Sequence, residues 1–388
     1  MLGFLLVLAA ALPPEEEYAA RAAAVKVGDA KTWLGLADFC EQKGLFERRT
    51  EALRKALEAD PEQPAAHARL DEKKTGGRWL PADEADAAEE ALQAKDGKAY
   101  YGKSWVPQAE AGKAAAADSK AAGFHVSVRI DTPHFSLYSG HGYGLTRRFA
   151  DVLESGADAY CAFYGSVWKT SVKPKPIKVL FFPDRDSFCR TVAPIMGDPP
   201  PSAQGVYSSK MKILYVSAPG NLSPEFTQIC ALHESIHGLD DAMVPGASSM
   251  APWLAEGRAD HLGFAILGRQ VIPGVLRLSP ESARVSQFRL TGDIRLQALL
   301  KMTQADFESE RMTQYYCLSW ALVSYLLHGE DGRYAPTFRK LLSGGKMPGA
   351  EGLAKALGTE LPAFEAAFKA YVEKEFLPAV ESGRPPGP

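Results

Sequence analysis

Phe124-His-Val-Ser-Val-Arg-Ile130 alternates apolar and polar residues, and Phe135-Ser-Leu-Tyr138 repeats the alternation shortly afterwards. A period of two residues is typical of half-buried β-strands, because successive side chains point to opposite faces of a sheet. Two further apolar runs, Ile177–Phe182 and Met211–Val216, are each followed within three residues by a proline that ends the run. These four segments predict a β-sheet in the middle of the chain.

Helical patterns lie between and after these strands. One covers residues 145–164, and everything beyond Leu222 has the pattern of helix and loop, with three amphipathic helices after Pro336. Strands followed by helices, rather than a strict alternation of the two, indicate an α+β domain, which we place at residues 124–380. Residues 381–388 are rich in proline and glycine, and we predict that they are disordered.

The part of the chain before the sheet has a different pattern. Residues 31–58 contain two predicted helices, and Asp60-Pro61 ends the second. The pair resembles one tetratricopeptide-like (TPR-like) helical hairpin, although Arg49 occupies a position where that repeat has a small residue. We therefore predict a small all-α, TPR-like segment over residues 15–93. Residues 94–122 are rich in Ala, Lys, Gly and Ser, which predicts a linker to the next domain.

The first twelve residues form an apolar run that is too short to span a bilayer, and Pro13-Pro14 and three glutamates follow it. This pattern predicts a signal peptide over residues 1–12 and a secreted or periplasmic protein. The basic residues that normally precede such a run are missing, which a misassigned start codon would explain. A buried N-terminal helix is the alternative interpretation.

The composition excludes some classes of partner. The chain has 388 residues and a net charge of -3, so no excess of Lys and Arg favours nucleic acid or an anionic membrane surface. No later stretch is apolar enough to cross a membrane, so we expect no membrane insertion after removal of the leader. The five cysteines are scattered without a Cys-x-x-Cys pair, which argues against a zinc ribbon or a redox motif. Cys230 and Cys317 are predicted core residues, and in an exported protein Cys161 and Cys189 could pair.

His233-Glu-Ser-Ile-His237 carries the chemistry that stands out most in this sequence. Ser223-Pro224 is a favourable helix start, and the apolar spacing after it predicts a helix to Gly238. Two imidazoles four residues apart lie on one face of a helix and can bind one zinc ion, while Glu234 can reach a water molecule at an open position. The alternative is a solvated helix face with three polar residues.

A second predicted helix starts at Pro252 and carries Glu256, which follows His237 after eighteen intervening residues. Two His and one Glu complete the three protein ligands of a catalytic zinc site and leave one position for water. Asp260 falls one turn after Glu256 and could accept the free imidazole N–H of a ligand histidine. The alternative for Asp260 is an exposed helix charge, and we expect His261 to serve packing or the surface rather than the metal.

The spacing His-Glu-x-x-His, eighteen residues, then Glu within Trp-Leu-x-Glu-Gly-x-Ala resembles the gluzincin, or peptidase MA-like, superfamily of zinc metallopeptidases. The resemblance covers residues 124–375. It implies a zincin-like domain, with a mixed sheet, an active-site helix beneath it and a helical C-terminal lobe. With its leader and helical segment, the whole chain is similar to an uncharacterised family of secreted bacterial peptidase-like proteins.

The same resemblance implies a role for Tyr316, which begins a segment that parallels the helix of the catalytic tyrosine in the aminopeptidase branch. A phenol there would donate to the oxyanion of the tetrahedral intermediate. Tyr315 is a rival, and an aromatic residue packed in the core is the alternative. His328 and Arg333 are weaker candidates.

One feature of the aminopeptidase branch is missing, namely the Gly-x-Met-Glu-Asn motif whose Glu binds the free amino group of the substrate. The nearest segment is Gly205–Ser209. An endopeptidase, or a narrower hydrolase, therefore fits this sequence better than an aminopeptidase.

The sequence thus predicts a zinc-dependent metallopeptidase that cleaves peptides or proteins, with Glu234 as general base. Two other functions stay open. The first is an inactive peptidase-like scaffold that binds a protein partner through its helical N-terminal segment, since a metal motif identifies a site better than a reaction. The second is a hydrolase of non-peptide substrates, because the aminopeptidase branch also includes an epoxide-opening enzyme.

Overall fold

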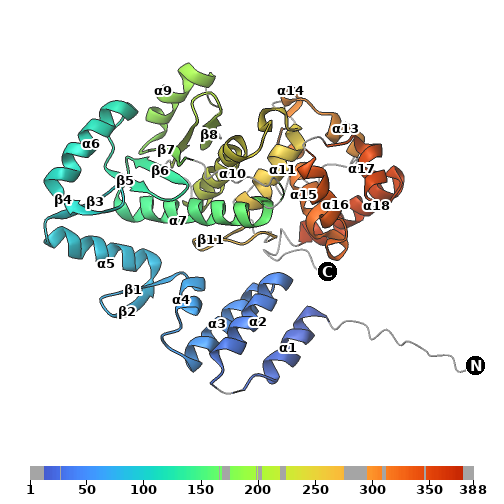
Figure 1. Ribbon diagram of the computed structural model, residues 1–388, viewed down its shortest axis with the longest axis horizontal. Coiled ribbons are helices and arrows are strands. Elements are labelled where there is room, and N and C mark those ends of the chain that lie inside the picture. Colours follow the sequence, from blue (N-terminus) through green and yellow to red (C-terminus); the bar gives the residue numbers. More distant parts are fainter. Residues whose placement is uncertain are drawn as a thin grey trace, which may run out of the picture. The chain divides into compact units, whose positions relative to one another are not determined.

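A computed structural model describes residues 13–26, 28–165, 167, 175–197, 199, 203–218, 224–274, 295–307, 312–344 and 347–378 (Figure 1). The chain divides into two compact units, Met1–Glu72 and Lys73–Pro388. The predicted signal peptide, the predicted capping residue Ser223 and the predicted disordered tail lie outside the described residues.

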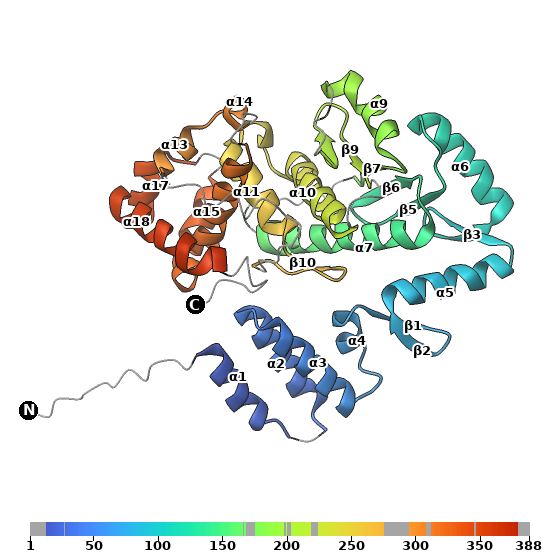
Figure 2. The ribbon, with the colours of Figure 1, turned by 180° about the vertical axis from the view of Figure 1, so that it is seen from behind.

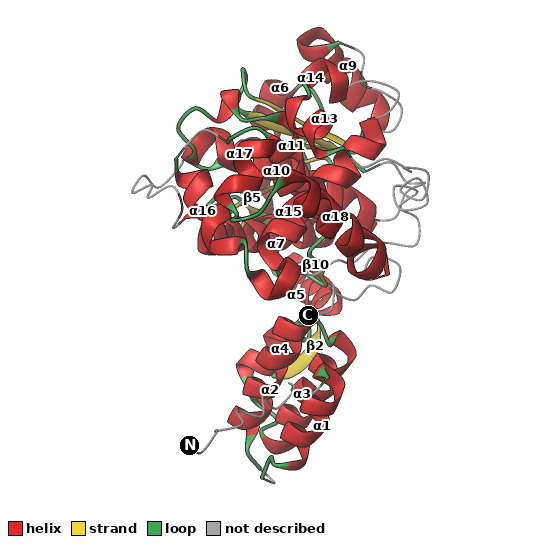
Figure 3. Ribbon diagram, turned by 90° about the vertical axis from the view of Figure 1, so that its right-hand side faces the viewer, coloured by secondary structure: helices red, strands yellow, loops and turns green. Residues whose placement is uncertain are grey.

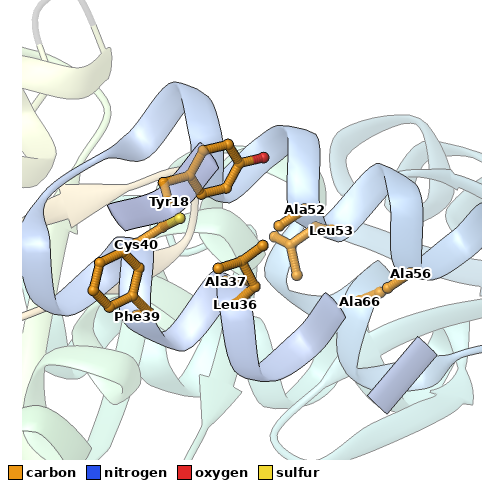
Figure 4. Close-up of a cluster of buried hydrophobic side chains, with 9 residues drawn as sticks. All are labelled: Tyr18, Leu36, Ala37, Phe39, Cys40, Ala52, Leu53, Ala56 and Ala66. Carbon is orange, nitrogen blue, oxygen red and sulfur yellow. The ribbon is translucent and has the colours of Figure 1, made fainter. Parts of the chain in front are cut away.

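The first unit is helical, as Figure 3 shows by its colouring. Its helices are α1 (Pro14–Ala23), α2 (Ala30–Lys43), α3 (Phe46–Ala59) and α4 (Pro64–Arg69). The Asp29 side chain accepts a hydrogen bond from the Thr32 N–H at 2.9 Å and so caps the start of α2, and Gly44 ends this helix in a left-handed conformation. Helices α2 and α3 pack against each other. Figure 4 shows the buried side chains of this unit: Tyr18, Leu36, Ala37, Phe39, Cys40, Ala52, Leu53, Ala56 and Ala66.

Arg49 is buried between these helices, although a TPR-like repeat has a small residue there. Its Nε donates to Oε1 of Glu41 at 2.5 Å, and the same carboxylate accepts from Nη2 of Arg69 at 2.7 Å. A buried charge is tolerated where an opposite charge compensates it. The helical hairpin therefore accommodates an arginine by pairing it.

The structure contradicts the prediction of an all-α segment to residue 93 and of a linker over 94–122. Residues 72–122 instead form two successive β-hairpins, each followed by a helix. The elements are β1 (Glu72–Thr75), β2 (Arg78–Pro81), α5 (Ala82–Lys95), β3 (Lys98–Tyr101), β4 (Ser104–Pro107) and α6 (Gln108–Ala122). Gly102 also bonds to the neighbouring strand β5 (Val128–Asp131), donating to the Arg129 carbonyl at 2.9 Å and accepting from the Asp131 N–H at 2.8 Å. The second hairpin is thus part of the larger unit.

A repeat in the sequence underlies these two hairpins. Gly76 and Gly102, Trp79 and Trp105, and Pro81 and Pro107 are corresponding pairs at a constant offset. Each glycine has a positive φ, which a tight hairpin turn requires. The strands have only four residues each, too few for an alternating pattern to stand out, and the alanine-rich helices have few large apolar residues. The constant offset between these three residue pairs is therefore the feature of the sequence that could have predicted the two hairpins.

The second unit contains a mixed five-stranded sheet, so the α+β prediction is confirmed at the level of fold class. The strands are, in spatial order, β5 (Val128–Asp131), β6 (Phe135–Ser139), β7 (Ile177–Phe182), β9 (Ile213–Ser217) and β8 (Gly205–Ser208). The pairs β6–β7 and β7–β9 are parallel, while β5 and β8 are antiparallel to their neighbours at the two edges. All four predicted strands are present, and β8 is an additional one.

Helices cover both faces of this sheet (Figure 2). On one face, α7 (Tyr143–Tyr160) packs Phe149 on Phe181, and α10 (Pro224–Met243) brings Gly238 against Ile177. On the other face, α9 (Arg185–Met196) packs Phe188 on Phe182. The side chains of adjacent residues of β7 thus point to opposite faces of the sheet, as the period of two residues in a strand requires. The sheet presents its β8 edge to α10, which positions the site described below.

The helical C-terminal part consists of several further elements. They are α11 (Pro252–Gly263), α13 (Leu296–Lys301), α14 (Gln304–Phe307), α15 (Met312–Gly332), α16 (Ala335–Ser343), α17 (Ala350–Ala356) and α18 (Leu361–Tyr371). The last three correspond to the predicted amphipathic helices, each with buried apolar residues. A short hairpin of β10 (Ile266–Leu267) and β11 (Gln270–Val271) was not predicted.

All five cysteines are free, so Cys161 and Cys189 do not form a disulfide in this structure. Cys317 is buried as predicted, while Cys230 is only partly buried. Among the helices that the structure describes, none has the length and apolarity needed to cross a membrane.

Candidate metal centre

Two helices bring together the predicted ligands. His233 and His237 lie one turn apart on α10, which continues to Met243, beyond the predicted end at Gly238. Apolar residues of α10 such as Leu232 and Ile236 are fully buried and hold the helix in place. Glu256 lies in the first half of α11, which begins at Pro252 as predicted. The helices α10 and α11 pack against each other.

The donor atoms of His233, His237 and Glu256 converge. Nε2 of His233 is 3.1 Å from Oε2 of Glu256 and 3.2 Å from Nε2 of His237, and the third separation, from His237 Nε2 to Glu256 Oε2, is 3.4 Å. Ligands about 2.0–2.1 Å from a zinc ion in tetrahedral geometry are about 3.3 Å from one another. These three residues therefore form a buried His-His-Glu group that could bind a metal ion, with the separations of a tetrahedral site.

The electrostatics of this group favour a cation. Burial by itself lowers the pKa of His233, but the carboxylates of Asp260 and Glu256 outweigh it and raise this pKa to about 10. The pKa of His237 is also raised, since Glu256 outweighs burial there too. Burial would raise the pKa of Glu256, yet the two imidazoles hold it well below its usual range. Positive charge among these three side chains is stabilised, whether a proton or a metal ion supplies it.

Asp260 is buried, not exposed on a helix surface. Its Oδ1 lies 2.7 Å from Nδ1 of His233, one turn along α11 from Glu256. A carboxylate at Nδ1 places the proton of a neutral His233 on that nitrogen and leaves Nε2 free to act as a metal ligand. The position is the one expected for Asp260 from its spacing, and the structure identifies His233 as the histidine that it contacts.

Glu234 points to the edge of the sheet. Its Oε2 accepts a hydrogen bond from the backbone N–H of Tyr207 on β8 at 2.8 Å. Tyr207 is itself held by a hydrogen bond from its hydroxyl to Oδ2 of Asp241 at 2.7 Å. Gly205, two residues before Tyr207, also faces Glu234, and a Cβ there would lie 3.2 Å from Cγ of Glu234. The sequence did not predict this contact, because β8 is short and its partner is distant along the chain.

Tyr316 and its rival Tyr315 separate in the structure. Both rings pack on Phe307, that of Tyr315 at 5.7 Å and that of Tyr316 at 5.8 Å between centroids, but the ring of Tyr316 also lies beside that of His233, with centroids 5.8 Å apart. Both residues are partly buried. Of the two tyrosines, the structure thus places Tyr316 next to a residue of the His-His-Glu group.

Close contacts at two glycines allow the helices to approach. A Cβ on Gly257, the residue after Glu256, would lie 2.4 Å from the backbone oxygen of Ser319 on α15. A Cβ on Gly263 would lie 3.4 Å from Cβ of His233 on α10. Backbone atoms cannot yield as a flexible side chain can, so Gly257 is needed for the close packing of α11 on α15. This packing brings the helix with Tyr316 beside the two ligand-bearing helices.

Two weaker candidates take other positions. His328 contacts His261, with 2.9 Å between their Nε2 atoms, and both rings lie against Phe163. Arg333 is largely exposed and pairs with Glu330 at 3.0 Å. Neither residue belongs to the His-His-Glu group.

Another possible metal-binding group and a cavity lie elsewhere in the second unit. His134, Glu154 and Asp158 have donor atoms close together, but these side chains are partly or fully exposed. A cavity of about 430 Å³ lies between the end of α10, the start of α11 and α16. Most of the residues that line it are of apolar type, among them Val244, Pro245, Met250, Leu254, Leu341, Leu342 and Met347. No member of the His-His-Glu group is among its lining residues.

A scan against protein-family models found no match for this chain, and a search of curated proteins found none either.

Proposed function

We propose that this protein is a zinc-dependent metallopeptidase of the gluzincin type. The observation that carries the proposal is the set of three donor atoms 3.1–3.4 Å apart, with Glu234 adjacent to the first ligand. Two imidazoles and one carboxylate suit zinc better than they suit calcium or magnesium, which prefer oxygen ligands alone. A zincin-like domain, with α10 as the active-site helix, agrees with the mixed sheet and the helical C-terminal part.

His233, His237 and Glu256 would hold the zinc ion, which would supply Lewis-acid chemistry, with a pKa of about 7 for a bound water and polarisation of the substrate carbonyl. Other residues of the chain transfer the proton, orient a ligand and stabilise the oxyanion. Glu234, oriented by the Tyr207 N–H, takes a proton from water and passes it to the leaving amine. Asp260 holds the tautomer of His233, and the phenol of Tyr316 is a candidate donor to the oxyanion.

Zinc content and peptide cleavage test this proposal with three variants. We expect one zinc per chain in the purified wild type and in Glu234→Gln, and almost none in His233→Ala. Glu234→Gln keeps an oxygen for the Tyr207 N–H but cannot accept a proton, so cleavage of a diverse peptide library should fall by about 10²-fold or more. Glu154→Gln, in the exposed group with His134, is the control and should change neither quantity.

Each contrary result has a distinct meaning. A wild type without zinc would remove the metal site from the proposal. A Glu234→Gln variant that keeps zinc and cleaves as fast as wild type would overturn the mechanism. A zinc-loaded wild type that cleaves no peptide in the library would favour the scaffold or a hydrolase of non-peptide substrates.

A further inference from the structure

A buried ion pair connects the two helices that carry the metal-binding residues. Nη2 of Arg258 on α11 donates to Oδ1 of Asp240 on α10 at 2.7 Å, and Nη1 lies 3.3 Å from Oδ2 of the same carboxylate. The hydroxyl of Tyr160 on α7 donates to Oδ1 of Asp240 at 2.6 Å. Arg258 is 0% exposed and Asp240 is 4% exposed. One carboxylate thus joins three helices.

This ion pair is close to the donor atoms along both helices. Asp240 follows His237 by three residues, and Arg258 follows Glu256 by two. At a rise of about 1.5 Å per residue, each member of the pair is within about 5 Å of a donor residue along its helix axis. A bidentate contact fixes both the separation and the relative rotation of two groups. A slip of α11 on α10 would therefore break the ion pair as it moved Glu256.

Stability alone is a weak reason for such a pair. Apolar residues of similar volume in place of a buried ion pair are often neutral or stabilising, whereas the removal of one partner is costly. Beyond the ion pair, Arg258 has an aromatic and a thioether neighbour, since its guanidinium carbon lies 4.4 Å from the ring centroid of Tyr164 and its Nη1 lies 3.3 Å from Sδ of Met250. A directional contact in such a place is best explained by a need for one particular arrangement of the helices.

We infer that the Asp240–Arg258 pair, with the Tyr160 hydroxyl, is a positioning device that holds Glu256 opposite His233 and His237. The inference rests on the proposed function in so far as it requires that the group binds a metal. Arg258, Asp240 and Tyr160 bind one another, and they act on the donor residues through the helices that carry them. They are positioning residues, and Arg258→Met is expected to leave all three ligands present but misaligned.

The matched control is a second buried arginine in the same unit. Arg269 is 5% exposed, and its Nη1 donates to Oδ2 of Asp86 at 2.6 Å and to Oδ2 of Asp151 at 2.7 Å. These contacts join α5, α7 and the β10–β11 hairpin and involve no residue of α10 or α11. Arg269→Met should therefore destabilise the fold without any effect on the geometry of the donors.

The experiment compares three quantities in full-length wild type, Arg258→Met and Arg269→Met. They are the zinc Kd from chelator competition, the visible absorption of the cobalt(II)-substituted protein, and the urea unfolding of the metal-free protein. We expect both variants to unfold at lower urea concentration. Only Arg258→Met should bind zinc about 10-fold or more weakly and change the cobalt spectrum, which reports ligand geometry.

Two milder variants cover the case in which Arg258→Met does not fold. Tyr160→Phe removes one hydrogen bond to Asp240, and Arg258→Lys keeps the charge but loses the bidentate contact. Each should weaken zinc binding less than Arg258→Met does. The inference is overturned if these variants, when destabilised, bind zinc within twofold of wild type with an unchanged cobalt spectrum. Absence of zinc binding in the wild type would overturn the proposed function as well.

Discussion

The second unit contains two histidine pairs with similar separations of their Nε2 atoms and with opposite electrostatics. The Nε2 atoms are 3.2 Å apart in His233 and His237, and 2.9 Å apart in His261 and His328. Carboxylates contact the first pair and raise the pKa of His233 to about 10. Burial, together with a smaller effect of Arg339, lowers the pKa of His328 to about 4. Burial, His328 and Arg258 also hold the pKa of His261 well below its usual range.

The difference shows that a short distance between two imidazoles does not make a metal site. Glu256 and Asp260 make the first pair attractive to a cation, whereas burial and, to a smaller extent, nearby guanidinium groups disfavour positive charge on the second pair. Asp260 and His261 are adjacent in sequence, but successive residues of a helix point in directions about 100° apart. Asp260 therefore reaches His233 on α10, and His261 reaches His328 on α15. The carboxylates, more than the histidines, distinguish the candidate metal centre.

Zinc should stabilise the protein only through the first pair. With free zinc at about 1,000 times its Kd, we expect the free energy of unfolding of wild type to rise by about 4 kcal/mol, because zinc binds the folded state selectively. His328→Gln should show the same increase and His233→Ala none. Urea unfolding at neutral pH with and without zinc measures this effect. Loss of the increase in His328→Gln would contradict the assignment of the two pairs.

Titration of the two pairs should also lower the stability of the metal-free protein in opposite pH ranges. His328 has a lowered pKa in the folded state, so the unfolded chain binds more protons as the pH falls from about 6.5 to 4, and stability decreases there. His233 has a raised pKa, so its contribution is fully present below about pH 6.5 and is lost as the pH rises towards 10. Each titrating group contributes a slope of up to about 1.4 kcal/mol per pH unit.

Urea unfolding of the metal-free protein between pH 4.5 and 9 measures the free energy of unfolding at both ends of this range. We call its decrease towards low pH the acid limb and its decrease towards high pH the alkaline limb. His328→Gln should flatten the acid limb, and His233→Gln should flatten the alkaline limb. If His328→Gln leaves the slope between pH 4.5 and 6.5 unchanged, the acid limb has another origin.

Removal of the charge beside His233 should have the smallest of these effects. Asp260→Asn keeps the shape of the side chain but removes the carboxylate that favours the Nδ1 proton, so zinc affinity should fall by about 10 to 100-fold. Competition with a chelator at fixed pH gives the ratio of Kd values. Asp241→Asn is a suitable comparison, because Asp241 is also on α10 but contacts Tyr207 and Lys212 instead of a donor histidine. Equal zinc affinities for wild type and Asp260→Asn would show that Asp260 only fills space.

Several features of the fold were predictable because they repeat locally. The four predicted strands, the helix start at Pro252 and the C-terminal amphipathic helices are all present, since alternation and helical spacing are properties of short windows. Residues 72–122 were misinterpreted for the same reason, because four-residue strands and alanine-rich helices give weak local patterns. Strand β8 escaped prediction because its role depends on pairing with β9 and on contact with α10.

The sequence by itself determined which donors are available and how two of them are spaced. His233 and His237 share a helix face because a helix repeats every 3.6 residues, whatever surrounds it. Only the tertiary structure decided that Glu256 and Asp260 contact them, that the ring of Tyr316 lies beside that of His233, and that Arg258 is paired with Asp240. These contacts join residues that are distant in sequence, so the packing of helices at points such as Gly257 determines them.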